Sequence, residues 1–336
     1  MSRILVDGHG GDSAPGVVIE ALKRVHHEYA GKMTLGIVGQ TDVLQPLLQA
    51  ASLADAVQIV QASEIIDMCE SPANALRRKK DSSMHVGARL VRDGEWDALV
   101  SAGNTGALMA ISKLILKTMP GVDRPAIASM IPADGGSGKT LLLDAGANVD
   151  SSSEHLTQFA IMGSCYMQAA EGIASPRVGV LNIGSEDIKG TDVVKMAGAS
   201  ISNLDLNYVG NVEGTDLFGD DVDVVVCDGF VGNVALKTME GVAHFLMGNL
   251  KRKLTGSLLA KAGMVLAMGA MRKLKARINP SEYNGAPLLG LNGMVVKSHG
   301  GADALGFSRA IEVAHREVES QLGTRIVEAM NTWLER

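Results

Sequence analysis

The sequence predicts an α/β fold, a Rossmann-like multilayer sandwich with a mostly parallel mixed sheet. Three observations lead to this prediction. Short apolar runs alternate with helical patterns along most of the chain, which is typical of a parallel sheet covered by helices. One strand, glycine turn and helix pattern occurs twice at an offset of 126 residues, as DALVSAGNTGAL at 97–108 and DVVVCDGFVGN at 223–233. A glycine-rich connector at 134–140 joins two apolar runs, and this hairpin makes the sheet mixed.

The elements follow in order from apolar periodicity and from residues that begin or end helices. Strands are expected at 4–6, 33–38, 57–60, 98–100, 126–131, 140–143, 177–182, 206–209, 224–227 and 294–297. Helices are expected at 15–29, 41–51, 71–81, 84–92, 108–116, 151–170, from 191 and up to about 334. Pro72 after Ser71, and the serines at 151–153, are typical of helix starts.

Composition limits the class of protein. With 336 residues, 46% hydrophobic and 20% charged, the chain can bury a sizeable core, and we expect one catalytic domain over 1–336. A net charge of −6 argues against nucleic acid as a partner. The three cysteines are far apart and lack metal-ligand spacing, which favours a reducing cytoplasm without disulfides. The chain begins in a strand, and it has neither a signal-peptide pattern nor a membrane-spanning apolar run.

Candidate site residues follow the predicted strands in the first part of the chain. A glycine turn before a helix directs free backbone N–H groups at one point, which suits an anion. Ordinary turns that need glycine for positive φ are the alternative. Asp7 and Asp12 argue against a bare phosphate cradle, because carboxylates repel phosphate unless a cation or a proton intervenes, and these two could instead orient basic residues. The candidates here are Asp7, Gly10, Gly11, Asp12, Ser101, Gly103, Asn104, Thr105 and Gly106.

Further candidates follow strands in the second part. Asn233 is expected to cap the helix after the second glycine turn, and Glu186 with Asp187 to hold the charge of Lys189. His299 lies at another glycine turn, although a solvated Lys189 and a structural His299 remain alternatives. The connector at 134–140 is not a P-loop, because Ala133 replaces its first glycine and a strand follows. The candidates here are Asp144, Gly146, Asn148, Asp150, Asn182, Gly184, Glu186, Lys189, Asp228, Gly229, Gly232, Asn233 and His299.

Residues 242–278 form a basic amphipathic helical hairpin that we expect to protrude from the sandwich. The segment 242–277 carries eight Lys and Arg residues and no acid, with apolar residues between the basic groups. An apolar tip rimmed by cations suits an anionic membrane surface, and an apolar face buried against a twin hairpin suits a dimer. Both can hold together. The predicted membrane contacts are Leu258, Leu259, Met264, Val265, Leu266 and Met268.

Several long motifs together resemble the bacterial phosphate acyltransferase family of phospholipid synthesis. They occur in order along nearly the whole chain. They are VSAGNTGALM (100–109), GKTLLLDAGANVD (138–150), QFAIMGS (158–164), VGVLNIGSEDIKG (178–190), VVVCDGFVGNVALKTMEG (224–241), YNGAPLLGLNG (283–293) and VVKSHGGA (295–302). One departure is His9, which stands where the first loop of the family usually has methionine.

The resemblance implies transfer of a long-chain acyl group from acyl carrier protein to inorganic phosphate, which gives an acyl phosphate. It also implies a fold related to phosphotransacetylases and isopropylmalate dehydrogenases, a homodimer, and a cytoplasmic enzyme associated peripherally with the membrane. No metal and no cofactor is implied.

The implied chemistry assigns roles to the candidates. Because phosphate is itself the nucleophile, no activated serine or cysteine is needed. Lys189 would balance the phosphate charge, and Asn233 with the backbone of Gly229 and Gly232 would hold the oxyanion or phosphate. Ser101, Asn104 and Thr105 would supply further phosphate donors, and His299 would handle a proton. Asp144, Asn148 and Asp150 would orient these groups.

Three competing readings remain at this point. Cys227 could take the acyl group before phosphate does, although the end of an apolar strand favours an inert buried thiol. A nicotinamide-dependent decarboxylating dehydrogenase on a related fold is disfavoured, because no G-x-G-x-x-G follows the first strand. A non-catalytic membrane scaffold built on the basic hairpin is the third reading.

Overall fold

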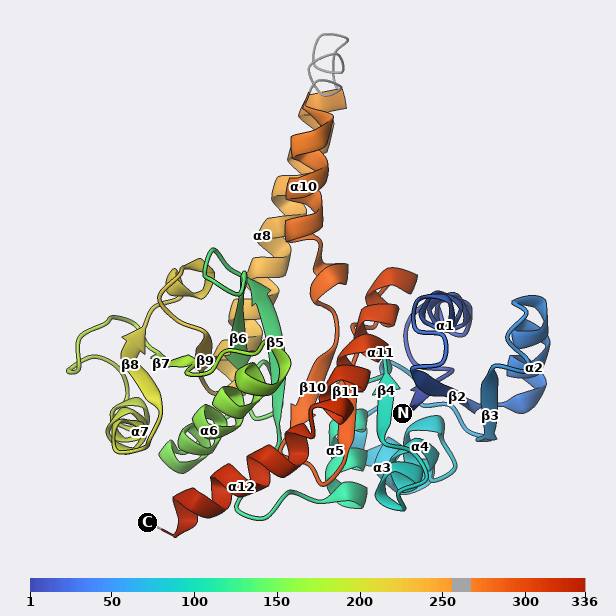
Figure 1. Cartoon of the computed structure of the whole chain (residues 1–336), viewed down its shortest axis with the longest axis horizontal. Coiled ribbons are helices and arrows are strands. Elements are labelled where there is room, and N and C mark those ends of the chain that lie inside the picture. The colour runs from blue at the N-terminus through green and yellow to red at the C-terminus, as the bar shows by residue number, and fades with distance from the viewer. Residues whose placement is uncertain (256–266, 336) are drawn as a thin grey trace.

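The computed structural model, which describes residues 1–255 and 267–335, contains a mixed sheet of 11 strands that runs through the molecule (Figure 1). The strand order is β3-β2-β1-β4-β11-β10-β5-β6-β9-β7-β8. The strands are β1 (Ser2–Asp7), β2 (Met33–Gly39), β3 (Val57–Gln61), β4 (Ala98–Ser101), β5 (Ala126–Pro132), β6 (Lys139–Leu143), β7 (Arg177–Leu181), β8 (Asn207–Val212), β9 (Val224–Val226), β10 (Ala286–Leu289) and β11 (Met294–Lys297). The predicted α/β sandwich with a mostly parallel mixed sheet is confirmed.

Helices join most of these strands, as the alternating pattern predicts. They are α1 (Gly16–Glu28), α2 (Thr41–Ala50), α3 (Pro72–Arg78), α4 (Ser83–Arg92), α5 (Thr105–Leu116), α6 (Ser153–Ala170), α7 (Asp192–Ser202), α8 (Gly229–Thr255), α10 (Met268–Ile278), α11 (Ala304–Glu319) and α12 (Leu322–Leu334). The side chains of Ser71 and Ser152 accept hydrogen bonds from the first turns of α3 and α6, respectively. Local capping therefore fixes these two starts as the sequence indicates.

The sheet consists of two parallel blocks that run in opposite directions. One block is β3-β2-β1-β4-β11 and the other is β6-β9-β7-β8. Between them, β10 pairs antiparallel with both β11 and β5, and β5 pairs antiparallel with β6. The predicted β5–β6 hairpin is confirmed. Strand β10 was missed, because it is only four residues long and contains Pro287, which usually demotes a strand.

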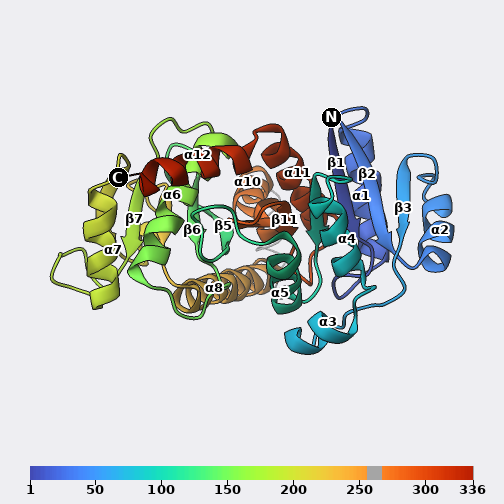
Figure 2. The same cartoon turned by 90° about the horizontal axis from the view of Figure 1, so that it is seen from below.

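Helices cover both faces of the sheet. Side chains from α4, α5 and α8 pack on one face, whereas those from α6, α7 and α12, and from α1 and α11, pack in separate clusters. Figure 2 shows α5 and α8 along one side of the sheet and α12 along the other. The three-layer arrangement follows from strands that are apolar on both faces, such as β4 and β9.

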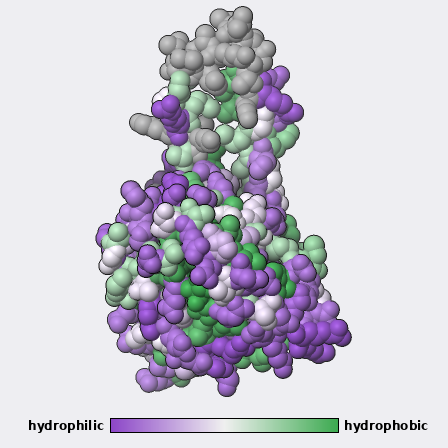
Figure 3. All heavy atoms as spheres, turned by 90° about the vertical axis from the view of Figure 1, so that its right-hand side faces the viewer, coloured by the Kyte–Doolittle hydropathy of each residue, from purple (hydrophilic) through white to green (hydrophobic). Residues whose placement is uncertain are grey.

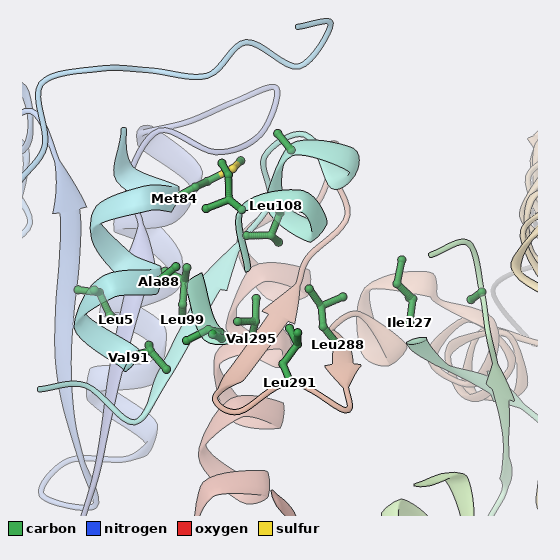
Figure 4. Packing of buried hydrophobic residues seen from close by; sticks show 14 of the residues in the cluster. Leu5, Met84, Ala88, Val91, Leu99, Leu108, Ile127, Leu288, Leu291 and Val295 are labelled. Atoms are coloured by element: carbon green, nitrogen blue, oxygen red, sulfur yellow. The ribbon is translucent and has the colours of Figure 1, made fainter. Parts of the chain in front are cut away.

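One apolar layer joins the two blocks. Leu5, Leu99 and Val295, which are all fully buried, pack together on β1, β4 and β11. Figure 4 shows the layer continuing through Leu288 of β10 to Ile127 of β5. Because buried side chains pack at near-crystal density, this layer holds the strand ends of both blocks in fixed relative positions.

Helices α8 and α10 form a hairpin that projects from the body, as the basic amphipathic pattern predicts (Figures 1 and 3). Apolar side chains on α8 face solvent, among them Val242, Phe245 and Leu246. Met268 begins α10 and is 39% exposed. The other predicted membrane contacts, Leu258, Leu259, Met264, Val265 and Leu266, lie outside the described residues. None of the helices within the described ranges has the length and hydropathy to cross a bilayer.

Candidate functional site

Three neighbouring strands end at one level and bring polar groups together. Register pairs Val6 of β1 with Val100 of β4, and Ser101 of β4 with Lys297 of β11. Ser101 Oγ donates to Asp7 Oδ2 at 2.7 Å and accepts from the Gly103 N–H at 3.1 Å. The first turn cluster is defined here as residues 7–12, 101–106 and 297–301. The structure thus joins the turn after β1 to the first glycine turn.

Lys297 is the cluster residue that the sequence reasoning missed. It is only 8% exposed, and its Nζ donates to the carbonyl of Ala102 at 3.3 Å and to the carbonyl of Ser298. Burial lowers the pKa of Lys297 to about 8, although nearby Asp7 raises it. The sequence signal was a lysine at the end of an apolar strand, directly before a Ser-His-Gly-Gly turn.

The loops of the first turn cluster are tied together by backbone bonds. The Asp12 N–H donates to the Gly300 carbonyl at 2.9 Å, which places the first loop beside the turn that carries His299. His299 is exposed, and its Nδ1 accepts from the Gly301 N–H at 3.1 Å, so a neutral ring carries its proton on Nε2. A side chain on Gly10 would place Cβ 2.6 Å from the Gly103 nitrogen, so the two loops need glycine there to approach each other.

Asn284 is a second residue that the sequence reasoning missed. Its Oδ1 accepts from the His299 N–H at 2.9 Å, and its Nδ2 donates to Ser298 Oγ at 2.8 Å and to the Gly306 carbonyl. Asn284 therefore ties the His299 backbone to the Ser298 side chain and to the first turn of α11. Its sequence signal was its place in the Tyr-Asn-Gly motif that carries the family resemblance.

Asn104 is occupied by structural bonds. Its Oδ1 caps α5 by accepting from the Ala107 N–H at 3.0 Å, and its Nδ2 donates to the carbonyls of Met68 and Glu70. Its predicted role as a phosphate donor would require it to leave these partners. Thr105 and Gly106 lie exposed in the first turn of α5 and remain open to a ligand.

The second turn cluster, residues 144–150 and 228–233, is built around Asp144. This side chain is fully buried, and its Oδ1 accepts from the backbone N–H groups of Ile127, Gly146 and Ala147. Its Oδ2 accepts from both the backbone and the side-chain nitrogens of Asn148. Burial raises the pKa of Asp144, and these hydrogen bonds oppose the rise. The carboxylate is a structural hub with no capacity left for a ligand.

The remaining residues of this cluster hold the start of α8. The Gly229 N–H donates to the Asn148 carbonyl at 2.7 Å, and Asp228 Oδ1 accepts from the Val231 N–H at 2.9 Å. The prediction that Asn233 caps the helix is wrong, because Asp228 supplies the capping oxygen and α8 already begins at Gly229. Asn233 lies exposed on the first turns, with its side chain facing Gly146.

Asp150 is an exposed member of the second turn cluster. Its side chain is 96% exposed, and its nearest partner is Arg124 at 3.8 Å. Ion pairs in so exposed a position contribute little stability.

The loop after β7 carries Asn182, Gly184, Glu186 and Lys189 at an open edge. Asn182 Nδ2 donates to the Lys189 carbonyl at 3.2 Å, and this bond shapes the loop. The Lys189 side chain is exposed. The prediction that Glu186 and Asp187 hold its charge fails within the described ranges, where Lys189 forms no ion pair with either.

The two glycine turns do not meet at one sheet edge. We expected both to follow parallel strands, but β4 and β9 belong to blocks that run in opposite directions. The link between them is α8. Its Leu236 and Met239 pack on the apolar layer that also holds α5. Its Lys237 lies close enough to Lys297 for its charge to lower the pKa of that residue further.

A cavity of about 280 Å³ lies away from both clusters, beside the amino end of β4. It is lined by Asp97, Leu288, Glu317 and Gln321 among others. Burial raises the pKa of Glu317 to about 8. None of the predicted site residues lines this cavity.

Comparisons with known proteins give the family. The model of the fatty acid synthesis protein family matches residues 2–325. The chain belongs to this family. This chain is 51% identical over 335 residues to a protein of Magnetococcus marinus named phosphate acyltransferase. The match covers 98% of this chain and 95% of that one. A phosphate acyltransferase of Alkalilimnicola ehrlichii is 49% identical, with 98% and 96% covered. The family resemblance seen in the motifs is thereby confirmed. The names of these relatives support an acyltransferase.

The fold has a solved counterpart. The structure of a phosphotransacetylase from Streptococcus pyogenes matches with a TM-score of 0.64 at 18% identity, and the match covers 95% of this chain and 94% of that one. The predicted relation to the phosphotransacetylase fold is confirmed. At this identity the likeness concerns the fold alone.

Proposed function

We propose that this protein transfers a long-chain acyl group from acyl carrier protein to inorganic phosphate and so forms an acyl phosphate for phospholipid synthesis. The observation that carries the proposal is identity of about half, over nearly the full chain, to proteins named phosphate acyltransferase. Such a reaction needs a held dianion, an oriented thioester and donors for the developing oxyanion. It needs no cofactor and no metal.

Direct attack by phosphate is favoured over an acyl-cysteine intermediate. Cys227 is 4% exposed, and burial raises its thiol pKa well above the ordinary value. Its Sγ lies 3.5 Å from the Asp144 carbonyl oxygen, inside the second turn cluster. A thiol in this environment is a poor nucleophile, because the thiolate is the reactive form.

The proposed reaction divides roles between the clusters. Backbone and side-chain donors of the first turn cluster, with His299 at its exposed rim, would face phosphate and handle a proton. Asn233 on α8 would serve the oxyanion, and Lys189 would add positive charge from the loop after β7. Thioester carbon–sulfur cleavage releases a thiolate whose ordinary pKa is about 8.5, so strong acid assistance is optional.

The projecting hairpin would place the enzyme at the membrane surface, where a long-chain acyl phosphate product would partition. Its basic residues and exposed apolar side chains on α8 suit an anionic membrane surface, a second copy of the chain, or both. We therefore propose a cytoplasmic homodimer that associates peripherally with the membrane and meets acyl carrier protein there.

The test is incubation of the protein with acyl carrier protein thioester and phosphate. Free carrier thiol should appear only when both substrates are present, and acyl phosphate should form in equal amount. Cys227→Ser should keep most of the activity, whereas Lys189→Ala and Asn233→Ala should lose it if their roles are correct. Thiol release that ignores phosphate would identify a thioesterase instead.

A further inference from the structure

Lys297 is a buried cation that forms no ion pair with an acid among residues 1–255 and 267–335, although the charge of Asp7 raises its pKa. The residue is 8% exposed, and its two described hydrogen bonds go to main-chain carbonyls, those of Ala102 and Ser298. An ammonium group has three N–H donors, so one remains unassigned. Burying a charge is unfavourable unless it is compensated, and two neutral carbonyls compensate only in part. A residue kept under such a penalty indicates a missing anion.

Of the two acids that act on Lys297, one bonds to other groups and the other is exposed. Asp7 on the adjacent part of the sheet engages Ser101 through Oδ2 and the His9 N–H through Oδ1. Asp12, the other acid whose field reaches Lys297, is exposed on the loop after β1. Lys237 on α8 also lowers the pKa of Lys297, but its own Nζ is paired with Glu240 Oε2 at 2.7 Å, so it supplies no free charge. Asp7 therefore orients the turn, and the third N–H of Lys297 stays open to a ligand.

Helix α5 adds to the same field. It begins directly after Asn104, and Thr105 and Gly106 of its first turn are exposed. The amino end of a 12-residue helix carries partial positive charge and suits a phosphate group. Lys297 is paired in register with Ser101, four residues before that helix starts. A buried lysine and a helix start thus belong to the same turn cluster.

We propose that inorganic phosphate binds at the first turn cluster with Lys297 as its principal cationic partner, and not at the loop that carries Lys189. This inference rests on the proposed function and places its phosphate. Lys297 holds the dianion through its free N–H while phosphate oxygen attacks the thioester carbon. Lys189, by contrast, is a solvated lysine on an open loop, and keeping a solvated charge requires no ligand.

The first experiment compares Lys297→Met, Lys189→Met and the exposed control Lys23→Met. Loss of one charged hydrogen bond should raise the phosphate KM of Lys297→Met by about 10- to 100-fold. Its KM for acyl carrier protein thioester should change less than about threefold, and Lys23→Met should behave as wild type. The opposite pattern, with the phosphate KM raised in Lys189→Met and unchanged in Lys297→Met, overturns the inference.

A second measurement uses the wild-type protein and remains valid if Lys297→Met does not fold. Calorimetric titration with inorganic phosphate at pH 8.5, in buffers of different ionisation enthalpy, counts the protons taken up. A dianion at Lys297 should raise the lysine pKa and draw in a fraction of a proton. Binding without proton uptake contradicts the inference.

Two combinations of results distinguish failure of the proposed function from failure of the proposed phosphate site. Phosphate binding with proton uptake but no thioester turnover would refute the proposed function and keep the phosphate site. Turnover that depends on phosphate, with wild-type phosphate KM in a folded Lys297→Met, would keep the function and refute the site. Vesicles containing phosphatidate should not compete for the site, because Lys297 is too enclosed to reach a lipid headgroup, and competition would count against free phosphate as its ligand.

Discussion

The two strand, turn and helix units share a sequence pattern and part of its structure, but they use their polar groups differently. In the first unit Asp97 accepts from the backbone and guanidinium of Arg3, and in the second Asp223 accepts in the same way from Arg177. These pairs join the base of each unit to the neighbouring strand. The offset of 126 residues therefore reflects a repeated structural device.

The far ends of the two units differ. Ser101 and Cys227 are equivalent at the same offset. Ser101 Oγ donates to the Asp7 carboxylate, whereas Cys227 Sγ lies beside the Asp144 carbonyl oxygen. Asp144 accepts five hydrogen bonds from nearby backbone and from Asn148, so the second turn is saturated. The first turn cluster keeps two exposed residues at the start of α5, Thr105 and Gly106, and the buried Lys297. One pattern thus yields a structural hub in one place and a candidate ligand site in the other.

The largest expected effect comes from adding a methyl group at equivalent glycines. A Cβ at Gly229 would lie 2.5 Å from the Asn148 carbonyl oxygen and 2.7 Å from Asp144 Oδ2. Neither oxygen can move away without breaking hydrogen bonds around Asp144. A Cβ at Gly103 would mainly meet the flexible end of Met84. Gly229→Ala should lose about 3 kcal/mol or more in urea unfolding, and Gly103→Ala about 1 kcal/mol. Equal losses would show that the two turns are equally rigid.

The next effect is a pair of opposite pH dependences. Burial lowers the pKa of Lys297 from 10.5 to about 8, so between these values the unfolded chain binds more protons and stability rises with pH. The gain, measured as wild type minus Lys297→Met, should approach about 3 kcal/mol by pH 10.5. Burial raises the pKa of Cys227, so above pH 9 the folded chain binds more protons and stability falls.

Urea unfolding across pH 7 to 10.5 checks both signs, with Cys227→Ala as the matched variant for the second turn. Because each effect is taken as a difference from wild type, the contributions of other lysines, tyrosines and Cys165 to the pH dependence of stability cancel. A wild-type advantage over Lys297→Met that stays constant with pH would mean that Lys297 is charged and solvated. The contrast between the units would then lose its main support.

The sequence predicted the elements well where local rules decide them, and less well where long-range pairing does. Capping by Ser71 and Ser152 set helix starts, and alternation of elements gave the fold class. Local rules could not predict the direction of the strands. The four-residue β10 pairs antiparallel with β11 between the two blocks, and this short strand with a proline gave no signal. The assumption of parallel ends at both glycine turns failed for that reason.

The candidate site shows the same division. Residues at strand ends, such as Asp7 and Ser101, were found because turns with polar side chains are visible in sequence. Lys297 was missed because its position resembles an ordinary strand end, and its burial without an ion pair to any described acid is visible only in three dimensions. Lys237 was missed because its approach to Lys297 depends on the course of α8 across the sheet.

The smallest expected effect concerns the ion pairs Arg3–Asp97 and Arg177–Asp223, at the bases of the two units. Their contributions to stability should be nearly equal. Burial alone would raise the pKa of Asp97 and Asp223, but hydrogen bonds from Arg3 and Arg177 leave both lowered. Such pairs stabilise above the unfolded carboxylate pKa, and the contribution is lost as pH falls through the folded value. Double-mutant cycles at pH 7 should give about 0.5–1 kcal/mol for Arg3–Asp97 and somewhat more for Arg177–Asp223. The second is favoured because the Asp223 side chain is 7% exposed against 26% for Asp97. A coupling several times larger in one unit would show that the units differ at their bases as well as at their turns.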